Sequence, residues 1–182
     1  AEGVPPEQIY GLLSTDRGLR LAFRKLDTIR DDIVWWQDPA EPAKMLSDGR
    51  AVMAAGFNGR FFDESQRSRA PIDIVWDGRI IGIEVWAVVA STDVPDIARA
   101  FIVHAAEPAS MARLASRIPY GPTRRSAFDR IGLNPDTGAP MRAYLPNAPQ
   151  HGGTALVRDS SWYANTEKLR QRRFRNWLSE TD

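Results

Sequence analysis

The chain has 182 residues, 43% hydrophobic and 26% charged, which is ordinary for a globular protein with one core or two small lobes. Its formal net charge of +1 gives no reason to expect nucleic acid as a partner. The absence of cysteine excludes disulfides, thiolate metal ligands and a cysteine nucleophile, and no apolar run approaches the ~20 residues of a membrane-spanning helix.

The N-terminal third alternates helical and strand patterns. Residues 1–15 contain proline and glycine and are expected to form an entry segment. Asp16 is expected to cap a helix that runs to about Arg30, because apolar residues recur there at helical spacing. A short buried strand over 33–36 and a short helix that ends before Gly49 should follow.

The stretch 51–88 organises the rest of the chain. Its first apolar run, 52–55, is typical of a strand covered on both faces, as in an α/β sheet. Phe57 and Arg60 follow that run, at a strand end where open sheets usually bind ligands. Further strands are expected over 72–76 and 80–88, and the last contains a lone carboxylate, Glu84. Either Glu84 lies on the wet face of an edge strand or it faces a partner.

The C-terminal half is predicted to be mostly helical and irregular. Asp96 is expected to begin a helix that reaches about His104, with Ile97, Phe101 and His104 on its inner face. Short helices over about 110–117 and 123–130, irregular chain over 132–153 and a helix over about 165–178 complete the series. The alternation of short strands and helices favours the α/β class.

Catalytic patterns are absent from the sequence. His104 is expected to be a core residue, His151 lies in a loop, and neither has a second histidine or a carboxylate at metal-ligand spacing. No nucleophile elbow, phosphate-binding loop or dinucleotide fingerprint occurs. We therefore expect no catalytic residue, no metal and no cofactor. Aromatic and polar side chains remain, and these are typical of a cleft that binds a small polar molecule: Phe57, Arg60, Glu84, Trp86 and Tyr120.

Several stretches together carry a resemblance to one family. They include LSDGRAVMAAGFNGR, IVWDGRIIGIEVWAVVAS, RIPYGPTRRSAF and the terminal WYANTEKLRQRRFRNWL. The chain resembles the C-terminal half of bacterial ABC-transporter periplasmic solute-binding proteins of the polyamine type (spermidine- and putrescine-binding), extracellular solute-binding protein family 1. The resemblance implies an α/β, two-lobe periplasmic-binding-protein-like (type II) fold whose N-terminal half is missing here.

The resemblance also implies a division into lobes and a set of partners. Residues 1–73 would belong to the second lobe, residues 74–132 would supply the crossing strands and part of the first lobe, and residues 133–182 would return to dock the last helix on the second lobe. The expected partners are a small amine or amino-acid ligand, an ABC permease in the inner membrane, and the missing half. The expected location is the periplasm. A fragment of this kind would expose a face that the missing half covers, and it could dimerise through that face.

Three positions that contact the ligand in this family have counterparts in this sequence. An acid two residues before a strand aromatic corresponds to Glu84, beside Trp86, and in polyamine binders it pairs with an ammonium group. An aromatic in the loop after the 52–55 run corresponds to Phe57, which would stack on the ligand. A tyrosine in the Pro- and Gly-rich loop corresponds to Tyr120. Trp36, Gln37 and Trp162 stay open as further cleft residues.

Arg60 departs from the diamine pattern, which tends to have an acid near this position. An arginine would repel a second ammonium group and could hold a carboxylate bidentately. Glu84 and Arg60 together would then suit an amino acid such as 4-aminobutyrate. The alternative for Arg60 is a surface salt bridge with Asp63 or Glu64.

The sequence thus predicts a non-enzymatic solute-binding component of an ABC importer. A binder needs different affinities for its open and closed states, so it needs no catalytic residues. Two alternatives stay open: an enzyme on the same two-lobe scaffold, and a truncated interaction domain that does not bind a ligand.

Overall fold

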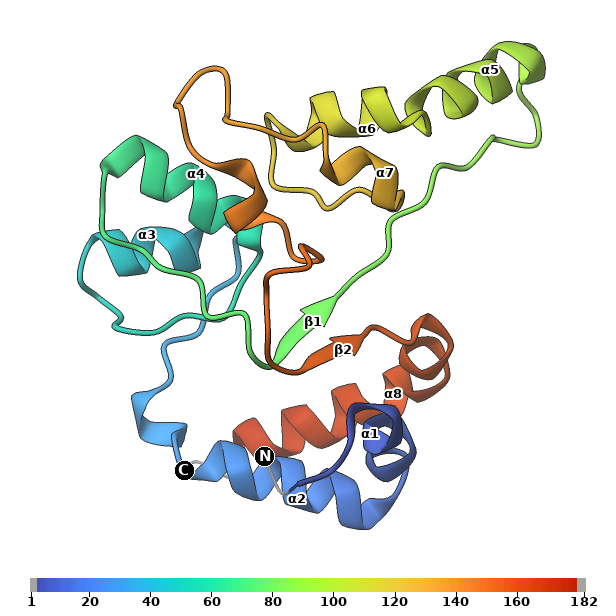
Figure 1. Cartoon of the computed structure of the whole chain (residues 1–182). Helices are drawn as coiled ribbons and strands as arrows, with labels where there is room; N and C mark the ends of the chain where they lie inside the picture. The colour runs from blue at the N-terminus through green and yellow to red at the C-terminus, as the bar shows by residue number, and fades with distance from the viewer. Residues whose placement is uncertain (1–2, 180–182) are drawn as a thin grey trace.

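The computed structural model describes residues 3–179, which form a lower and an upper body joined by two short strands (Figure 1). The lower body holds α1 (Pro6–Leu13), α2 (Asp16–Asp27) and α8 (Ser160–Ser179). The upper body holds α3 (Glu41–Ser47), α4 (Asn58–Ser68), α5 (Pro95–Ala105), α6 (Pro108–Ala115) and α7 (Arg125–Phe128). The strands are β1 (Arg79–Ile81) and β2 (Ala155–Val157), and the 3-10 turns are η1 (Arg30–Asp32) and η2 (Met141–Tyr144). No helix within residues 3–179 is long and apolar enough to cross a membrane.

The lower body is held by contacts between α2 and the end of α8. Trp177 of α8 is buried, and its indole Nε1 donates to Asp27 Oδ1 at 2.6 Å. The ring of Phe23 lies 6.0 Å from that of Trp177, centroid to centroid. The C-terminal helix therefore docks on α2 through Trp177.

In the N-terminal region, helix α1 was not predicted and the predicted cap of α2 was wrong. The entry segment contains α1, which begins after Pro5 with a proline in its first turn, a position where the missing N–H costs nothing. The cap of α2 is Thr15 and not Asp16, because Thr15 has extended backbone angles and its side chain accepts from the backbone N–H of Gly18 at 3.0 Å. Asp16 instead pairs with Arg173 of α8 at 2.5 Å.

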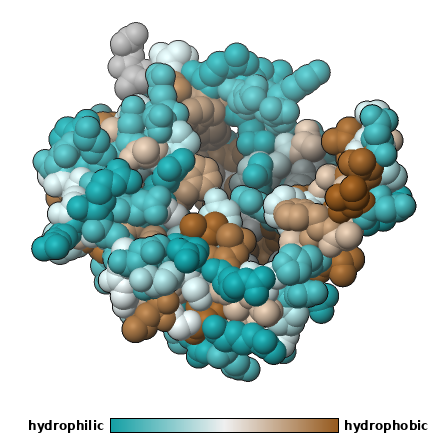
Figure 2. Space-filling model, turned by 90° about the horizontal axis from the view of Figure 1, so that it is seen from above, coloured by the Kyte–Doolittle hydropathy of each residue, from teal (hydrophilic) through white to brown (hydrophobic). Residues whose placement is uncertain are grey.

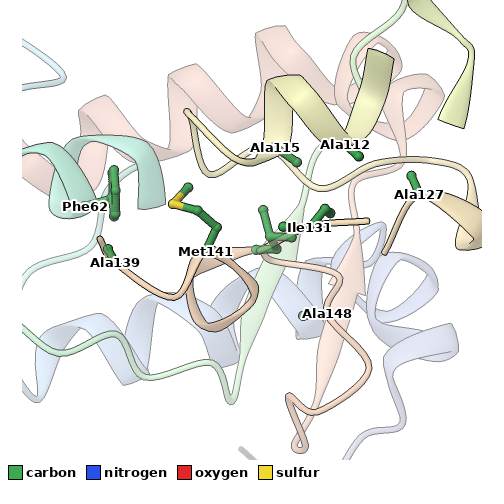
Figure 3. Packing of buried hydrophobic residues seen from close by; sticks show 9 residues of the cluster. Phe62, Ala112, Ala115, Ala127, Ile131, Ala139, Met141 and Ala148 are labelled. Atoms are coloured by element: carbon green, nitrogen blue, oxygen red, sulfur yellow. The ribbon is translucent and has the colours of Figure 1, made fainter. Parts of the chain in front are cut away.

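The chain predicted to be irregular, 132–153, supplies four residues of the core of the upper body: Ala139, Met141, Leu145 and Ala148. Phe62 of α4 packs with alanines of α6 and α7 and with side chains from 131–148 (Figure 3). Met141 and Leu145 are fully buried there. Asn134 is also buried, and its side-chain Oδ1 accepts from the backbone N–H groups of Asp136 and Thr137 at 2.9 and 3.0 Å. Irregular backbone is thus tolerated inside because its polar groups are satisfied.

Most of the predicted strands are absent. Residues 33–36, 52–55 and 72–76 form no strand, and of the predicted strand over 80–88 only its start pairs, as β1. Val52 and Met53, predicted to be covered on both faces, are 96% and 84% exposed. A strand needs a neighbour that satisfies its backbone donors and acceptors, and β1–β2 is the single ladder among residues 3–179, with Arg79 opposite Ala155 and Ile81 opposite Val157.

Helix α5 also departs from the prediction. Ile97, Phe101 and His104, expected on an inner face, are exposed. Helix α5 extends away from α3 and α4 at the end of the upper body, so this face meets little protein (Figure 1). His104 is therefore a surface residue, with its Nδ1 3.6 Å from Glu107 Oε2, and not a core histidine.

Candidate functional site

The start of α4 and the loop 118–122 are joined by one side chain, Asn58. Its amide Nδ2 donates to the backbone carbonyl of Pro119 at 2.7 Å and to that of Tyr144 at 3.2 Å. A Cβ built on Gly59 would lie 3.8 Å from Tyr120 Cε1, in ordinary van der Waals contact. The structure therefore brings the Phe57–Arg60 segment next to Tyr120, as one cluster.

The aromatic members of this cluster offer free surface. Phe57 is 60% exposed and Tyr120 is 51% exposed. Both rings lie on backbone that other contacts hold, since Phe57 precedes the first residue of α4 and Tyr120 follows the carbonyl bound by Asn58. They can therefore stack on an apolar chain or face a cation without being core residues.

Arg60 does not form the salt bridge that was its alternative explanation. Glu64 is engaged elsewhere, with Arg67 at 3.8 Å and with the hydroxyl of Ser47 at 2.8 Å. An arginine four residues before a glutamate is also the weaker order for a helical ion pair. The Arg60 guanidinium is exposed and has no ion pair among the described residues, so it can receive an anion.

Glu84 and Trp86 lie on a different segment. Both belong to the extended, exposed chain that follows β1, and the ring of Trp86 packs edge-on against Phe101 of α5 at 5.2 Å. Within residues 3–179 no hydrogen bond, ion pair or ring contact joins Glu84 or Trp86 to Phe57, Arg60 or Tyr120. The predicted site residues thus fall into two groups.

The residues left open by the sequence have structural contacts. Trp162 Nε1 donates to Ser14 Oγ at 2.9 Å, and its ring lies 5.0 Å from that of Tyr10 in the lower body. The backbone N–H of Gln37 donates to Glu41, while Trp36 is half-buried. Trp35, predicted to be buried, is 53% exposed and packs edge-on against Phe174 and Trp177.

The crossing between the bodies is fixed by side chains that sequence reasoning did not select. Asp77 Oδ1 accepts from the backbone N–H of Thr154 at 2.5 Å and from its hydroxyl at 2.9 Å. The backbone hydrogen bond from Thr154 is the main reason that the pKa of Asp77 lies below its usual value, and the hydroxyl adds to it. The Asp-Gly turn was visible in the sequence, but its partner 77 residues away was not.

His151 lies beside this crossing. Its ring stacks on Trp76 at 4.3 Å, and its Nε2 is buried without a hydrogen bond among the described residues. Burial lowers the pKa of His151, and the positive charge of Arg79 lowers it further. The ring therefore stays neutral near pH 7 and packs on Trp76, which lies just before β1.

The arrangement supports binding by charge and stacking. No group of three His, Cys, Asp or Glu side chains within residues 3–179 could hold a metal ion. The cluster of Phe57, Arg60 and Tyr120 supplies aromatic surface and the free guanidinium group of Arg60. The segment after β1 supplies the free carboxylate of Glu84. Such groups recognise a small molecule with charged ends.

Comparison with known proteins identifies the family of this chain. The family described as bacterial extracellular solute-binding protein matches residues 1–140. A gamma-aminobutyric acid-binding protein from Pseudomonas aeruginosa is 35% identical over 180 residues, which cover 98% of this chain and 49% of that protein.

Two solved structures share the fold. The PBP MotA from A. tumefaciens B6 in complex with glucopine has a TM-score of 0.72 at 21% identity, over 97% of this chain and 54% of that one. The Atu4243–GABA receptor has a TM-score of 0.68 at 23% identity, over 97% and 51%. This chain therefore has part of a two-lobe binding-protein fold, as predicted, and spans about half the length of the relatives it matches. The chain belongs to the family of bacterial extracellular solute-binding proteins.

Proposed function

We propose that this chain is the C-terminal half of the solute-binding component of an ABC importer, and that the whole protein binds an amine-bearing small solute in a cleft between two lobes. The observation that carries the proposal is the 35% identity to a gamma-aminobutyric acid-binding protein across 98% of this chain. Solute capture requires domain closure around a ligand and no catalytic group.

We assign 4-aminobutyrate as the first candidate solute. Glu84 would pair with its ammonium group and Arg60 would hold its carboxylate through a bidentate contact. Phe57, Tyr120 and Trp86 would cover its methylene chain. The free guanidinium of Arg60 supports this assignment, because the competing salt bridge with Glu64 is not formed.

Putrescine and spermidine are the competing solutes. They belong to the polyamine class that the sequence resembles, and Glu84 suits their ammonium groups equally well. Arg60 argues against them, because a guanidinium group repels a second ammonium group placed beside it. The choice among the three solutes thus depends on Arg60.

The proposal also names partners and a place. The whole protein would work in the periplasm and deliver its solute to an ABC permease in the inner membrane. Residues 1–73 and 133–182 would belong to the second lobe, and residues 74–132 to the crossing and the first lobe. The other half of the protein would cover the exposed chain after β1.

Isothermal calorimetry on the protein with both halves tests the assignment. We expect 4-aminobutyrate to bind more tightly than putrescine or spermidine. Glu84→Gln and Arg60→Ala should each weaken 4-aminobutyrate at least tenfold, while Arg67→Ala and Glu107→Gln, matched changes on exposed residues, should not. If Arg60→Ala leaves the affinity for 4-aminobutyrate unchanged or raises it, the role given to Arg60 is wrong.

A second candidate is an interaction domain without ligand binding, favoured by the apolar side chains that the chain leaves exposed. Val85, Val89 and Phe101 are 82%, 70% and 53% exposed, and Figure 2 shows separate hydrophobic patches among hydrophilic residues on the face seen from above. Such surface favours association. The isolated chain should therefore dimerise in light scattering, whereas a stable monomer at high concentration would count against this candidate.

A further inference from the structure

A groove between α2 and α8 in the lower body combines a cationic rim with an aromatic floor. Its volume is about 470 Å³, and its lining includes Arg17, Arg20, Arg24, Phe23, Arg173 and Trp177, together with one carboxylate, Asp27. The two helices lie side by side at the bottom of Figure 1, below the β1–β2 pair. None of these residues belongs to the candidate solute site.

The charge in this groove is concentrated and largely uncompensated. Arg17, Arg20 and Arg24 are spaced by three and four residues, so they share one face of α2, and all are exposed. None of the three has an ion pair within residues 3–179, although Asp16 and Asp27 are nearby. Those two carboxylates are occupied by other arginines.

Asp16 and Asp27 do not neutralise the positive charge of Arg17, Arg20 and Arg24. Asp16 pairs with Arg173 at 2.5 Å, and Asp27 accepts from Trp177 Nε1 and lies 3.8 Å from Arg30. Three free guanidinium groups therefore remain on one face, in a chain whose total charge is only +1. Like charges at this helical spacing repel and destabilise the helix, so packing alone gives no reason for them.

The floor of the groove is apolar. Phe23 is half-buried, Trp177 is buried, and their ring centroids lie 6.0 Å apart at a tilt of 31°. Guanidinium groups hold carboxylates in a planar, bidentate geometry, while the half-buried ring of Phe23, packed on Trp177, offers a surface for an apolar side chain. The groove is therefore complementary to a chain that carries both acidic and apolar groups.

We propose that this α2–α8 groove is a docking surface for an acidic peptide segment of a partner protein, with an apolar residue of that segment on the Phe23–Trp177 floor. A peptide can enter a concave groove between two helices and reach both rim and floor. A flat lipid surface would meet only the rim. The partner is thus defined by chemistry: clustered carboxylates around one apolar side chain.

The test is fluorescence anisotropy with a labelled peptide of glutamate residues around a single phenylalanine, added to the purified full-length protein. The peptide should bind in low salt and be released as ionic strength rises to about 1 M, where the Debye length falls to about 3 Å. The triple variant Arg17→Gln, Arg20→Gln, Arg24→Gln should bind at least tenfold more weakly. The control variant Arg99→Gln, Arg124→Gln, Arg125→Gln removes the same charge from exposed positions elsewhere and should bind as the unchanged protein does.

Circular dichroism checks that both variants keep their helices. Three results would overturn the proposal: no binding of the peptide in low salt, equal weakening by the two triple variants, or stronger binding to phosphatidylglycerol vesicles than to the peptide with the same dependence on Arg17, Arg20 and Arg24. The last result would assign the groove to an anionic membrane surface instead. Because the solute site shares no residue with the groove, 4-aminobutyrate binding is measured on the same variants and should be unchanged.

Discussion

Asn58 joins three segments of the upper body through a single side-chain amide. It begins α4, and its two hydrogen bonds reach the loop before Tyr120 and the end of η2. Pro119 and Tyr144, which follow Asn58 by 61 and 86 positions in the chain, are thereby held against the first turn of α4. The placement of Phe57 next to Tyr120 therefore depends on one residue that carries no charge and no aromatic ring.

Asn58→Ala should destabilise the protein by about 1–3 kcal/mol, because two carbonyl groups lose their donor in a partly buried place. Urea denaturation followed by circular dichroism measures this. Asn165→Ala is the control, since Asn165 is exposed on α8 and alanine is the better helix former. Equal stability of the two variants would show that Asn58 does not hold the loop.

Asp77 gives a prediction about pH at the crossing between the bodies. Its pKa is lowered in the folded state, mainly by the backbone N–H of Thr154 and then by the Thr154 hydroxyl. A carboxyl group with a lowered folded pKa stabilises the protein above its unfolded pKa, here about the reference value of 3.8, and this contribution is lost as pH falls through the folded pKa. Asp77→Asn should thus be less stable than the unchanged protein at pH 7, and the difference should vanish below that pKa.

Urea denaturation at a series of pH values from 7 downward measures this difference. Asp63→Asn is the matched control, because Asp63 is exposed and has no ion pair or hydrogen bond through its side chain within residues 3–179. A stability difference for Asp77→Asn that stays constant with pH would contradict the assigned role.

Residue type and local pattern selected Phe57, Arg60, Glu84, Trp86 and Tyr120 as candidate site residues. Phe57 was predicted to follow a strand over 52–55, but it precedes the first residue of α4 and that strand is not formed. The partners of Asn58 and Asp77 could not be predicted, because each lies more than 60 residues away and backbone carbonyls and N–H groups leave no mark in the sequence. The roles of the five selected residues stay a proposal.

At the scale of elements, helices were predicted better than strands. An amphipathic helix satisfies its own backbone hydrogen bonds, so the patterns of α2, α6 and α8 were sufficient to find them. A strand depends on a neighbour, and the apolar runs over 52–55 and 72–76 have none within residues 3–179. The strand pattern was present, but the ladder that would complete it was not.

The chain after β1 should therefore behave differently with and without its partner. Backbone amides of residues 82–90 should exchange with deuterium rapidly in the isolated chain and slowly in the protein with both halves, because pairing protects them. Amides of α6 should be protected in both samples, since α6 packs in the upper core. Rapid exchange of residues 82–90 in the longer protein would contradict the assignment of this segment to a strand.

The irregular segment 131–148 should be as sensitive to truncation as a helix in a core. Met141→Ala or Leu145→Ala should cost about 2–5 kcal/mol, because both side chains are fully buried and leave a cavity. Leu133→Ala, at a residue 65% exposed, should change stability by no more than about 0.5 kcal/mol. Thermal and urea denaturation of the three variants measures the contrast, and similar values for all would place the core elsewhere.

At the scale of the whole molecule, the chain has two helical bodies and one crossing pair of strands. The fold matches just over half of each of two solved structures and about half of a gamma-aminobutyric acid-binding protein. The separation of the predicted site residues into two groups is what a site shared between two halves would give. The arginine groove of α2 and α8 lies apart from both groups, so docking and solute binding can be tested independently.

The most direct measurement is a calorimetric titration of 4-aminobutyrate into this chain alone and into the protein with both halves. The proposal predicts saturable binding only when both halves are present, because Arg60, Glu84 and the aromatic side chains need the other lobe to close over the solute. Equal binding by the chain alone would contradict a site between lobes. No binding of 4-aminobutyrate, putrescine or spermidine by the longer protein would contradict the amine-bearing solute itself.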